Sequence, residues 1–183
     1  KIVPLTRGVI EIELESGETI QTDNLVIANG PWAVALGDSL GFTIPMTPLR
    51  GQIVHASLPS GFDLPSYSVF HDATYMLPKA SGDLLLGTTD EVAGFNSFPT
   101  KEAERDILAS VIDMIPLLES ASVVRTTACL RPSTPDDLPI MGKIPDWDGI
   151  YLATGHGHKG ITLALVTGKA IGGLIAKGNS DFD

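Results

Sequence analysis

The chain has 183 residues, of which 43% are hydrophobic, and its formal net charge is −10. This length suffices for one domain or two small ones with a sizeable core, and the apolar content argues against a disordered chain. The acidic charge disfavours direct nucleic-acid binding, because phosphate groups repel a negative surface.

A single cysteine, Cys129, excludes an intramolecular disulfide and argues against a cysteine-based zinc site. The expectation is therefore a reducing, cytoplasmic setting. The longest apolar runs, such as Ile161–Val166, are too short to cross a bilayer, so no membrane span is predicted. The chain starts at Lys1 without a signal peptide or an initiator methionine, and we expect an amino-terminal portion to be missing.

The first third of the chain is predicted to form short strands. Val9–Leu14 alternates with period two, and Thr19–Gln21 follows after a turn. Leu25–Ala28 is wholly apolar, which is typical of a strand buried on both faces. A short helix is expected to reach Leu36.

Prolines and glycine between residues 45 and 51 indicate a change of element, after which Gln52–Ser57 is predicted to be a strand. Residues 58–68 are expected to form a loop. Ala73–Pro78 and Leu84–Thr88, joined by a Ser-Gly-Asp turn, predict a hairpin.

The clearest helix is predicted over residues 101–115. Thr100 is its expected N-cap, Glu102 and Glu104 favour the positive end of the helix dipole, and Pro116 ends it. Apolar residues recur on one face, at Ile107, Leu108, Val111, Ile112 and Ile115.

The last third is predicted as strand Ser122–Leu130, a proline-rich loop over 132–139, strand Gly149–Thr154, loop Gly155–Gly160 and helix Ile161–Lys177. The loop spells G-x-G-x-x-G between a strand and a helix, which is the context of a dinucleotide fingerprint. Against a pyrophosphate site, the chain ends before the second strand that this fingerprint requires. A second interpretation is that the glycines only allow a turn and close helix packing.

A third interpretation, which we favour, uses the free N–H groups at the start of the helix, at Gly160, Ile161 and Thr162. A helix amino terminus favours negative charge and would stabilise the electron-rich edge of a reduced flavin.

Five segments occur in an order that resembles the D-amino-acid oxidase superfamily, and within it glycine oxidase and related FAD-dependent amine oxidoreductases. The resemblance spans nearly the whole chain. The segments are LVIANGPW (Leu25–Trp32), PLRGQIV (Pro48–Val54), YMLPKASGDLLLGTT (Tyr75–Thr89), LRPSTPDDLPIMG (Leu130–Gly142) and IYLATGHGHKGIT (Ile150–Thr162).

The resemblance implies an α+β fold. An antiparallel-sheet substrate domain (residues 48–129) would join a partial Rossmann-type FAD domain, made of strands and the carboxy-terminal helix (residues 1–47 and 130–183). The family carries its own dinucleotide fingerprint at the amino terminus, and nothing before residue 155 matches it. The chain therefore resembles the carboxy-terminal portion of such an enzyme, and a missing amino-terminal FAD-binding segment is its expected partner.

The function implied is oxidation of an amino acid or secondary amine by hydride transfer to FAD. One alternative is an isolated or degenerate domain that binds a carboxylate ligand without catalysis. Another is an FAD domain fused to an RNA-modifying enzyme, which the acidic charge disfavours unless the fused partner contacts the RNA.

In the resemblance, Arg131 pairs with the substrate carboxylate, for which a planar guanidinium is suited. Its expected place is a loop directly before Pro132; the alternative is a surface or structural arginine. Tyr75 corresponds to a tyrosine lining the substrate site, and the alternative is a tyrosine packed in the sheet. Arg50, in R-G-Q, corresponds to an arginine near the flavin, and the alternative is a simple turn between domains.

His158 stands where glycine oxidase has a second arginine, so a weaker, pH-dependent carboxylate partner is expected. Asp90 stands where relatives often carry an apolar residue, which suggests a more polar pocket. His156 and His158 lack an evident third ligand, so no metal is predicted. The residues expected at the cofactor are Gly30, Trp32, Arg50, Gly51, His156, Gly157, His158, Lys159, Gly160, Ile161 and Thr162.

Overall fold

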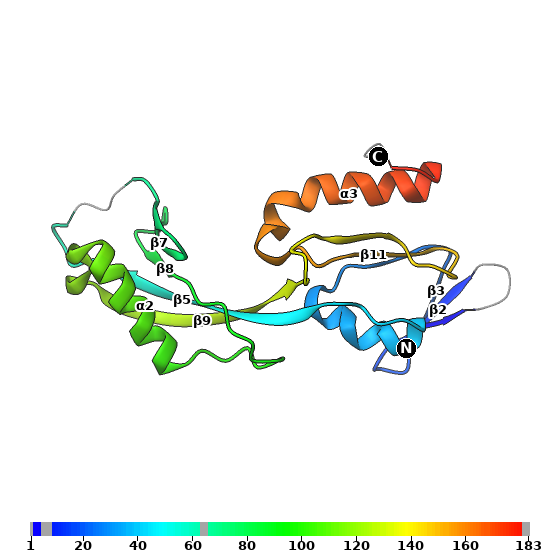
Figure 1. Cartoon of the computed structure of the whole chain (residues 1–183), viewed down its shortest axis with the longest axis horizontal. Helices are drawn as coiled ribbons and strands as arrows, with labels where there is room; N and C mark the ends of the chain where they lie inside the picture. Colours follow the sequence, from blue (N-terminus) through cyan, green and yellow to red (C-terminus); the bar gives the residue numbers. More distant parts are fainter. Residues whose placement is uncertain (1, 5–8, 63–65, 181–183) are drawn as a thin grey trace. The chain divides into compact units, whose positions relative to one another are not determined.

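The computed structural model describes residues 2–4, 9–62 and 66–180. The chain divides into two compact units, one formed by residues 1–47 with 131–183 and the other by residues 48–130. The domain boundaries expected from the resemblance, at residues 47/48 and 129/130, lie at or one residue from these. Helices and sheets are both present in an α+β arrangement, as the sequence predicts (Figure 1).

The first unit holds two three-stranded sheets. One is antiparallel throughout; in the other, β11 pairs antiparallel with β10 and parallel with β4. In sheet order, the strands are β1 (Ile2–Pro4), β2 (Ile10–Glu13) and β3 (Thr19–Thr22), and then β10 (Ile140–Lys143), β11 (Ile150–Thr154) and β4 (Leu25–Ile27).

Helices lie on both sides of the sheet that contains β11. The 3-10 helix η1 (Gly30–Leu36) and the short α1 (Gly37–Leu40) lie on one side, and α3 (Gly160–Lys177) lies on the other (Figure 1). Apolar residues of the sheets and of η1 and α1 form one core, which includes Ile10, Ile27, Ala33, Leu40, Ile44, Ile150 and Leu152.

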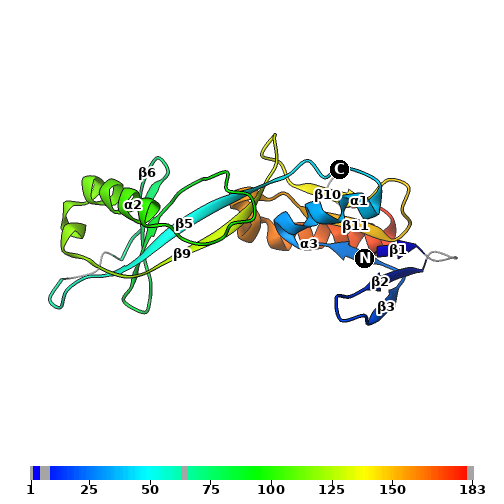
Figure 2. The same cartoon turned by 90° about the horizontal axis from the view of Figure 1, so that it is seen from below.

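The second unit is a five-stranded sheet with a helix on one face. In Figure 2, β5 and β9 run side by side, and α2 (Lys101–Met114) lies in the same unit with the short η2 (Pro116–Ser120) after it. In sheet order, the strands are β6 (Val69–His71), β7 (Thr74–Pro78), β8 (Leu84–Gly87), β5 (Thr47–Ser57) and β9 (Ser122–Ser133). The core between sheet and helix contains Val54, Ala56, Met76, Leu84, Leu86, Ile107 and Val111.

The predicted start of α2 is confirmed. Thr100 accepts a hydrogen bond on its hydroxyl from the backbone N–H of Ala103 at 3.3 Å, as an N-cap does. Ile107 and Val111 of the predicted apolar face are buried. The cap and the apolar face therefore fix where the helix begins and which side meets the sheet.

The prediction that Arg131 and Pro132 lie in a loop is wrong, since β9 continues to Ser133. Proline is tolerated there because β9 is an edge strand, where a missing N–H need not break the sheet. The short strands β1, β6 and β10 were not expected either, and β5 begins at Thr47 rather than at Gln52. The expected loop over 58–68 includes residues 63–65, which lie outside the described residues.

The carboxy-terminal helix bears on the expectation that no segment is long enough to cross a membrane. By length and composition alone, the segment Gly157–Lys177 could cross a membrane, and only 17% of its most apolar window is buried in this structure. Core helices of water-soluble proteins pass the same test. The feature to be explained is the large exposed apolar surface of α3, which includes Ile161 and Leu165, 97% and 90% exposed.

Candidate functional site

The glycine loop packs tightly against the chain that follows Arg131. Gly155 has φ +76°, and a Cβ placed on it would lie 2.7 Å from Thr134 Cγ2 and 3.1 Å from the Ile140 amide nitrogen. Neither the backbone angle nor the space admits a side chain. The segment after Arg131 and the loop after β11 are therefore adjacent.

No side chain caps the amino end of α3. Gly157–Lys159 form a single 3-10 turn, η3, which leads directly into α3 at Gly160. The residue before the helix, Lys159, makes no side-chain capping bond, and Ile161 is 97% exposed. The first N–H groups of a helix have no intrahelical partner, and they carry the positive end of its dipole. This end of α3 suits an electron-rich group.

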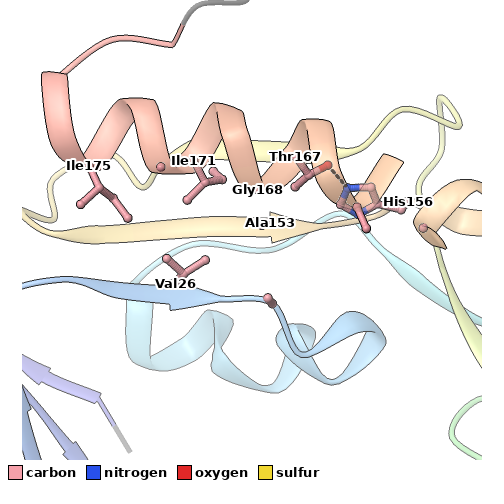
Figure 3. Close-up of a pocket in the computed structure, with 11 residues that line it drawn as sticks. Val26, Ala153, His156, Thr167, Gly168, Ile171 and Ile175 are labelled. Atoms are coloured by element: carbon pink, nitrogen blue, oxygen red, sulfur yellow. Dashed lines mark hydrogen bonds between the residues drawn. The ribbon is translucent and has the colours of Figure 1, made fainter. Parts of the chain in front are cut away.

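His156 fastens the loop to α3. Its Nε2 lies 2.9 Å from Thr167 Oγ1, and Figure 3 shows this bond beneath the first turns of the helix. Burial lowers the pKa of His156 from its ordinary value of 6.5. At neutral pH the imidazole is therefore uncharged, and its Nε2 can accept a hydrogen bond from the Thr167 hydroxyl.

We expect the imidazole of His156 to titrate below pH 6.5. Because the pKa is lower in the folded than in the unfolded chain, the unfolded chain binds the proton more readily. The stability that comes from the neutral ring is then present above pH 6.5 and is lost as the pH falls through the folded pKa. An NMR titration of the His156 ring protons tests this, with a His156→Gln variant to assign the signal. A midpoint at or above 6.5 would contradict it.

Gly30 lies beside the end of β11, because Thr154 Oγ1 donates a 3.0 Å hydrogen bond to its carbonyl oxygen. Gly30 and Gly157 have φ +60° and +50°, and a Cβ on either would meet no atom within 4 Å. The backbone is thus approachable at both points, and Trp32 nearby in the chain is 53% exposed. Accessible backbone at Gly30 and Gly157 and the uncapped start of α3 therefore follow or adjoin the end of β11.

The remaining loop residues, His158 and Lys159, are exposed at the surface of the first unit, as is Thr162. Arg131 is half-buried near the end of β9 and is assigned to the same unit. No three His, Cys, Asp or Glu side chains gather as metal ligands in the part of the chain that the structure describes.

The other predicted residues belong to the second unit, where Arg50 forms an ion pair. Its Nη2 and Nε lie 2.6 and 3.2 Å from Glu91 Oε2, and Nη1 donates to the Phe98 carbonyl at 3.2 Å. The main chains of Arg50 and Glu91 also exchange two hydrogen bonds. Arg50 is 8% exposed, so its charge is largely buried and neutralised by this partner.

Gln52, next to Gly51, extends the network. Its side chain is fully buried; the amide nitrogen donates to Glu91 Oε1 at 2.8 Å, and the amide oxygen accepts from the Thr100 N–H at 2.7 Å. Thr89 Oγ1 donates to Glu91 at 2.5 Å. The network joins β5, the segment after β8 and the start of α2.

Sequence reasoning missed Gln52, Thr89 and Glu91. The signal in the sequence was a pair of polar runs beside apolar residues. R-G-Q comes before the predicted strand's apolar residues, and T-T-D-E follows the apolar run Leu84–Leu86. Their pairing is set by strands far apart in the sequence, which a local pattern does not reveal.

Tyr75 lies on β7, half-buried. Its backbone partners are Phe70 on β6 and Gly87 on β8. The aromatic rings of Phe70 and Tyr75 have centroids 5.9 Å apart at an interplanar angle of 47°. The tyrosine therefore has a defined packing environment within the second unit.

Comparison with known proteins identifies the family. The FAD dependent oxidoreductase model matches residues 2–174. Glycine oxidase of Pseudomonas aeruginosa is 33% identical over 168 residues, covering 92% of this chain and 45% of that protein. The solved structure of glycine oxidase from Geobacillus kaustophilus has a TM-score of 0.91 at 28% identity, covering 100% of this chain and 48% of that one.

A second solved structure, iminodiacetate oxidase from Chelativorans sp. BNC1, has a TM-score of 0.86 at 25% identity, covering 100% of this chain and 50% of that one. The chain thus spans about half the length of the proteins it matches. The resemblance to glycine-oxidase-like proteins of the D-amino-acid oxidase superfamily is confirmed. The chain belongs to the FAD dependent oxidoreductase family, and it corresponds to a partial length of its glycine oxidase members.

Proposed function

We propose that the protein containing this chain oxidises a small amino acid or secondary amine, and that the chain contributes the flavin-facing loop and the carboxylate-binding residues. The observation that carries the proposal is the amino end of α3 after the glycine loop, which no side chain caps and where Ile161 is 97% exposed. FAD would supply the acceptor for a hydride from the substrate's α-carbon, and that chemistry belongs to the cofactor.

The chain's own residues would bind and orient. The N–H groups at Gly160, Ile161 and Thr162 would stabilise negative charge on the flavin edge. The guanidinium of Arg131 would hold the substrate carboxylate through two parallel hydrogen bonds, with His158 of the same unit as a further partner. In the second unit, the hydroxyl of Tyr75 would be a donor to a carboxylate. Arg50 and Gly51 would contact the cofactor with backbone atoms rather than with the Arg50 guanidinium, because that guanidinium is already paired with Glu91.

The test is to express the full-length protein and record its absorption spectrum. A yellow protein with bound FAD whose flavin band bleaches when glycine or sarcosine is added without oxygen supports the proposal. A colourless protein that binds no FAD rejects it. A colourless protein that still binds glycine would favour the alternative, a carboxylate-binding domain without catalysis.

We further propose that, in the whole protein, an amino-terminal FAD-binding half covers the exposed face of α3. Beneath this face lies a cavity of about 570 Å³ between α3 and strands β4 and β11. Figure 3 shows Ile171 and Ile175 of the helix and Val26 of β4 on its walls. Four small residues, spaced by four along the helix, line it: Gly160, Ala164, Gly168 and Gly172.

Small residues at this spacing let a second helix approach closely. β4 is the edge strand of its sheet among the described residues, and a parallel edge strand is normally covered by further strands. The relatives are about twice as long as this chain, so a protein segment of sufficient size is available to them.

In a Cys129→Ser background, needed because Cys129 is itself exposed, we expect a Leu165→Cys variant of the full-length protein to resist maleimide labelling until the protein is denatured, although Leu165 is 90% exposed in this chain. An Arg105→Cys variant on α2, whose arginine side chain is 72% exposed, should label readily. Rapid labelling of Leu165→Cys in water would reject the protein cover. Protection seen only with phospholipid vesicles would instead indicate a membrane.

A further inference from the structure

Four cross-strand partners form a row over the sheet of the second unit. Phe70 on β6 pairs with Tyr75 on β7, Tyr75 pairs with Gly87 on β8, and Gly87 pairs with Ile53 on β5. Directly opposite residues in a sheet project on the same face, so the three side chains stand side by side with one vacant place, at Gly87.

The ring of Tyr75 occupies the space over Gly87. A Cβ placed on Gly87 would lie 2.5 Å from Tyr75 Oη and 2.9 Å from Cε1, and Cζ would be nearer still. Gly87 itself is buried. On its other side Tyr75 meets the ring of Phe70, so the phenol lies between an aromatic ring and a bare stretch of backbone.

The backbone angle of Gly87 is not the reason for glycine there. Its φ lies outside the left-handed region, unlike Gly82 in the turn of the same hairpin, which has φ +91° and no atom within 4 Å of a Cβ. Gly82 serves the turn, whereas Gly87 provides room for the tyrosine ring.

We propose that Gly87 is a positioning residue for Tyr75: by lacking a side chain, it holds the phenol across β8 in the direction from which its hydroxyl meets the substrate carboxylate. The inference rests on the proposed carboxylate role of Tyr75. It predicts that a single methyl group at Gly87 moves the ring and weakens carboxylate binding.

A methyl group is expected to displace the ring more than the strand. The atoms that it would meet are the far end of a side chain, which can rotate, rather than backbone. The φ of Gly87 lies outside the left-handed region, so this angle does not itself exclude alanine.

The experiment uses the full-length protein with its FAD and four variants: Gly87→Ala, Tyr75→Phe, Tyr75→Ala and the double variant Gly87→Ala/Tyr75→Ala. Acetate, which offers only a carboxylate, is titrated by its effect on the flavin spectrum. We expect Gly87→Ala and Tyr75→Phe each to weaken acetate binding about 10-fold, the size of one hydrogen bond to a charged group. In the Tyr75→Ala background, Gly87→Ala should have no further effect.

A second readout follows the ring itself. In protein labelled with 3-fluorotyrosine, the Tyr75 ¹⁹F signal, assigned by its loss in Tyr75→Phe, should shift in Gly87→Ala while the other tyrosine signals stay. If Gly87→Ala alone does not fold and the double variant does, the contact between methyl and ring is supported as well.

An unchanged Tyr75 signal, or an equal effect of Gly87→Ala with and without the tyrosine, overturns the positioning role. If Gly87→Ala shifts the signal but Tyr75→Phe binds acetate as the wild type does, the carboxylate role of Tyr75 fails and the inference fails with it. Absence of bound FAD in the wild type would be a failure of the proposed function alone, because the fluorine signal still reports whether Gly87 fixes the ring.

Discussion

Replacing Arg131 with leucine in the full-length protein is expected to weaken binding of the substrate carboxylate by about 100-fold, with FAD content unchanged. Truncating one member of a hydrogen-bonded charge pair costs about 2–5 kcal/mol, and about 1.4 kcal/mol corresponds to a factor of ten. The measurement is the KM for the amino acid that bleaches the flavin, together with the dissociation constant of acetate.

Two variants make this test specific. Arg131→Lys keeps the charge but not the planar fork, so it should fall between wild type and Arg131→Leu. Arg125→Leu removes an exposed arginine from the same strand, β9, and should leave both constants unchanged. If Arg125→Leu matches Arg131→Leu, the effect is one of overall charge and the assignment of Arg131 is wrong.

The sequence predicted elements whose causes are local. Helix α2 follows from its Thr100 cap, its apolar face and the proline after it, and each of these acts within a few residues. The strand, glycine loop and helix at the carboxy end were found in the same way, from an apolar run, glycines and a second apolar run.

What the sequence did not predict depends on pairing between distant segments. β10 forms because residues 140–143 lie opposite β11, and β6 because residues 69–71 lie opposite β7. The strand character of Arg131 depends on its lying on a sheet edge, where Pro132 is tolerated. Composition and periodicity reveal none of these three pairings.

The candidate residues stay predictions, and the sequence did not indicate what they contact. Family segments supplied the glycine loop, Arg131 and Tyr75. The partners of these residues, such as Thr167 for His156 and Gly87 for Tyr75, emerged only from contacts in the structure. Arg50 illustrates the difference most clearly, because its sequence context suggested a cofactor contact while its guanidinium is engaged with Glu91.

Replacing Glu91 with alanine is expected to lower the free energy of unfolding of the second unit by about 2–4 kcal/mol. Removing one partner of a buried ion pair costs about 3–5 kcal/mol, and the partial exposure of Glu91 reduces this. The guanidinium of Arg50 would be left buried without its counter-charge, and Gln52 and Thr89 would each lose an acceptor. Urea unfolding followed by circular dichroism measures the change.

The same carboxylate gives the stability a pH dependence of known sign. Burial alone would raise the pKa of Glu91, but hydrogen bonds from Thr89, Arg50 and Gln52, with the charge of Arg50, hold it below its ordinary value of 4.5. The stabilisation is therefore complete above pH 4.5 and is lost as the pH falls through the lower, folded-state pKa. Glu91→Gln should remove this part of the acid dependence.

The controls distinguish the buried Arg50–Glu91 pair, which belongs to a hydrogen-bond network, from an exposed ion pair outside it. Asp148→Ala removes the carboxylate from the exposed Lys143–Asp148 pair, whose atoms are 2.8 Å apart, and should leave the unfolding midpoint unchanged because solvent screens that pair. The double variant Arg50→Met/Glu91→Leu should recover part of the loss, since it leaves no buried charge unpaired. If Glu91→Ala is as stable as the wild type, the network does not hold the segment after β8 to β5 and α2. Equal stability in the double variant and in Glu91→Ala would instead assign the loss to the hydrogen bonds that Gln52 and Thr89 donate to the Glu91 carboxylate.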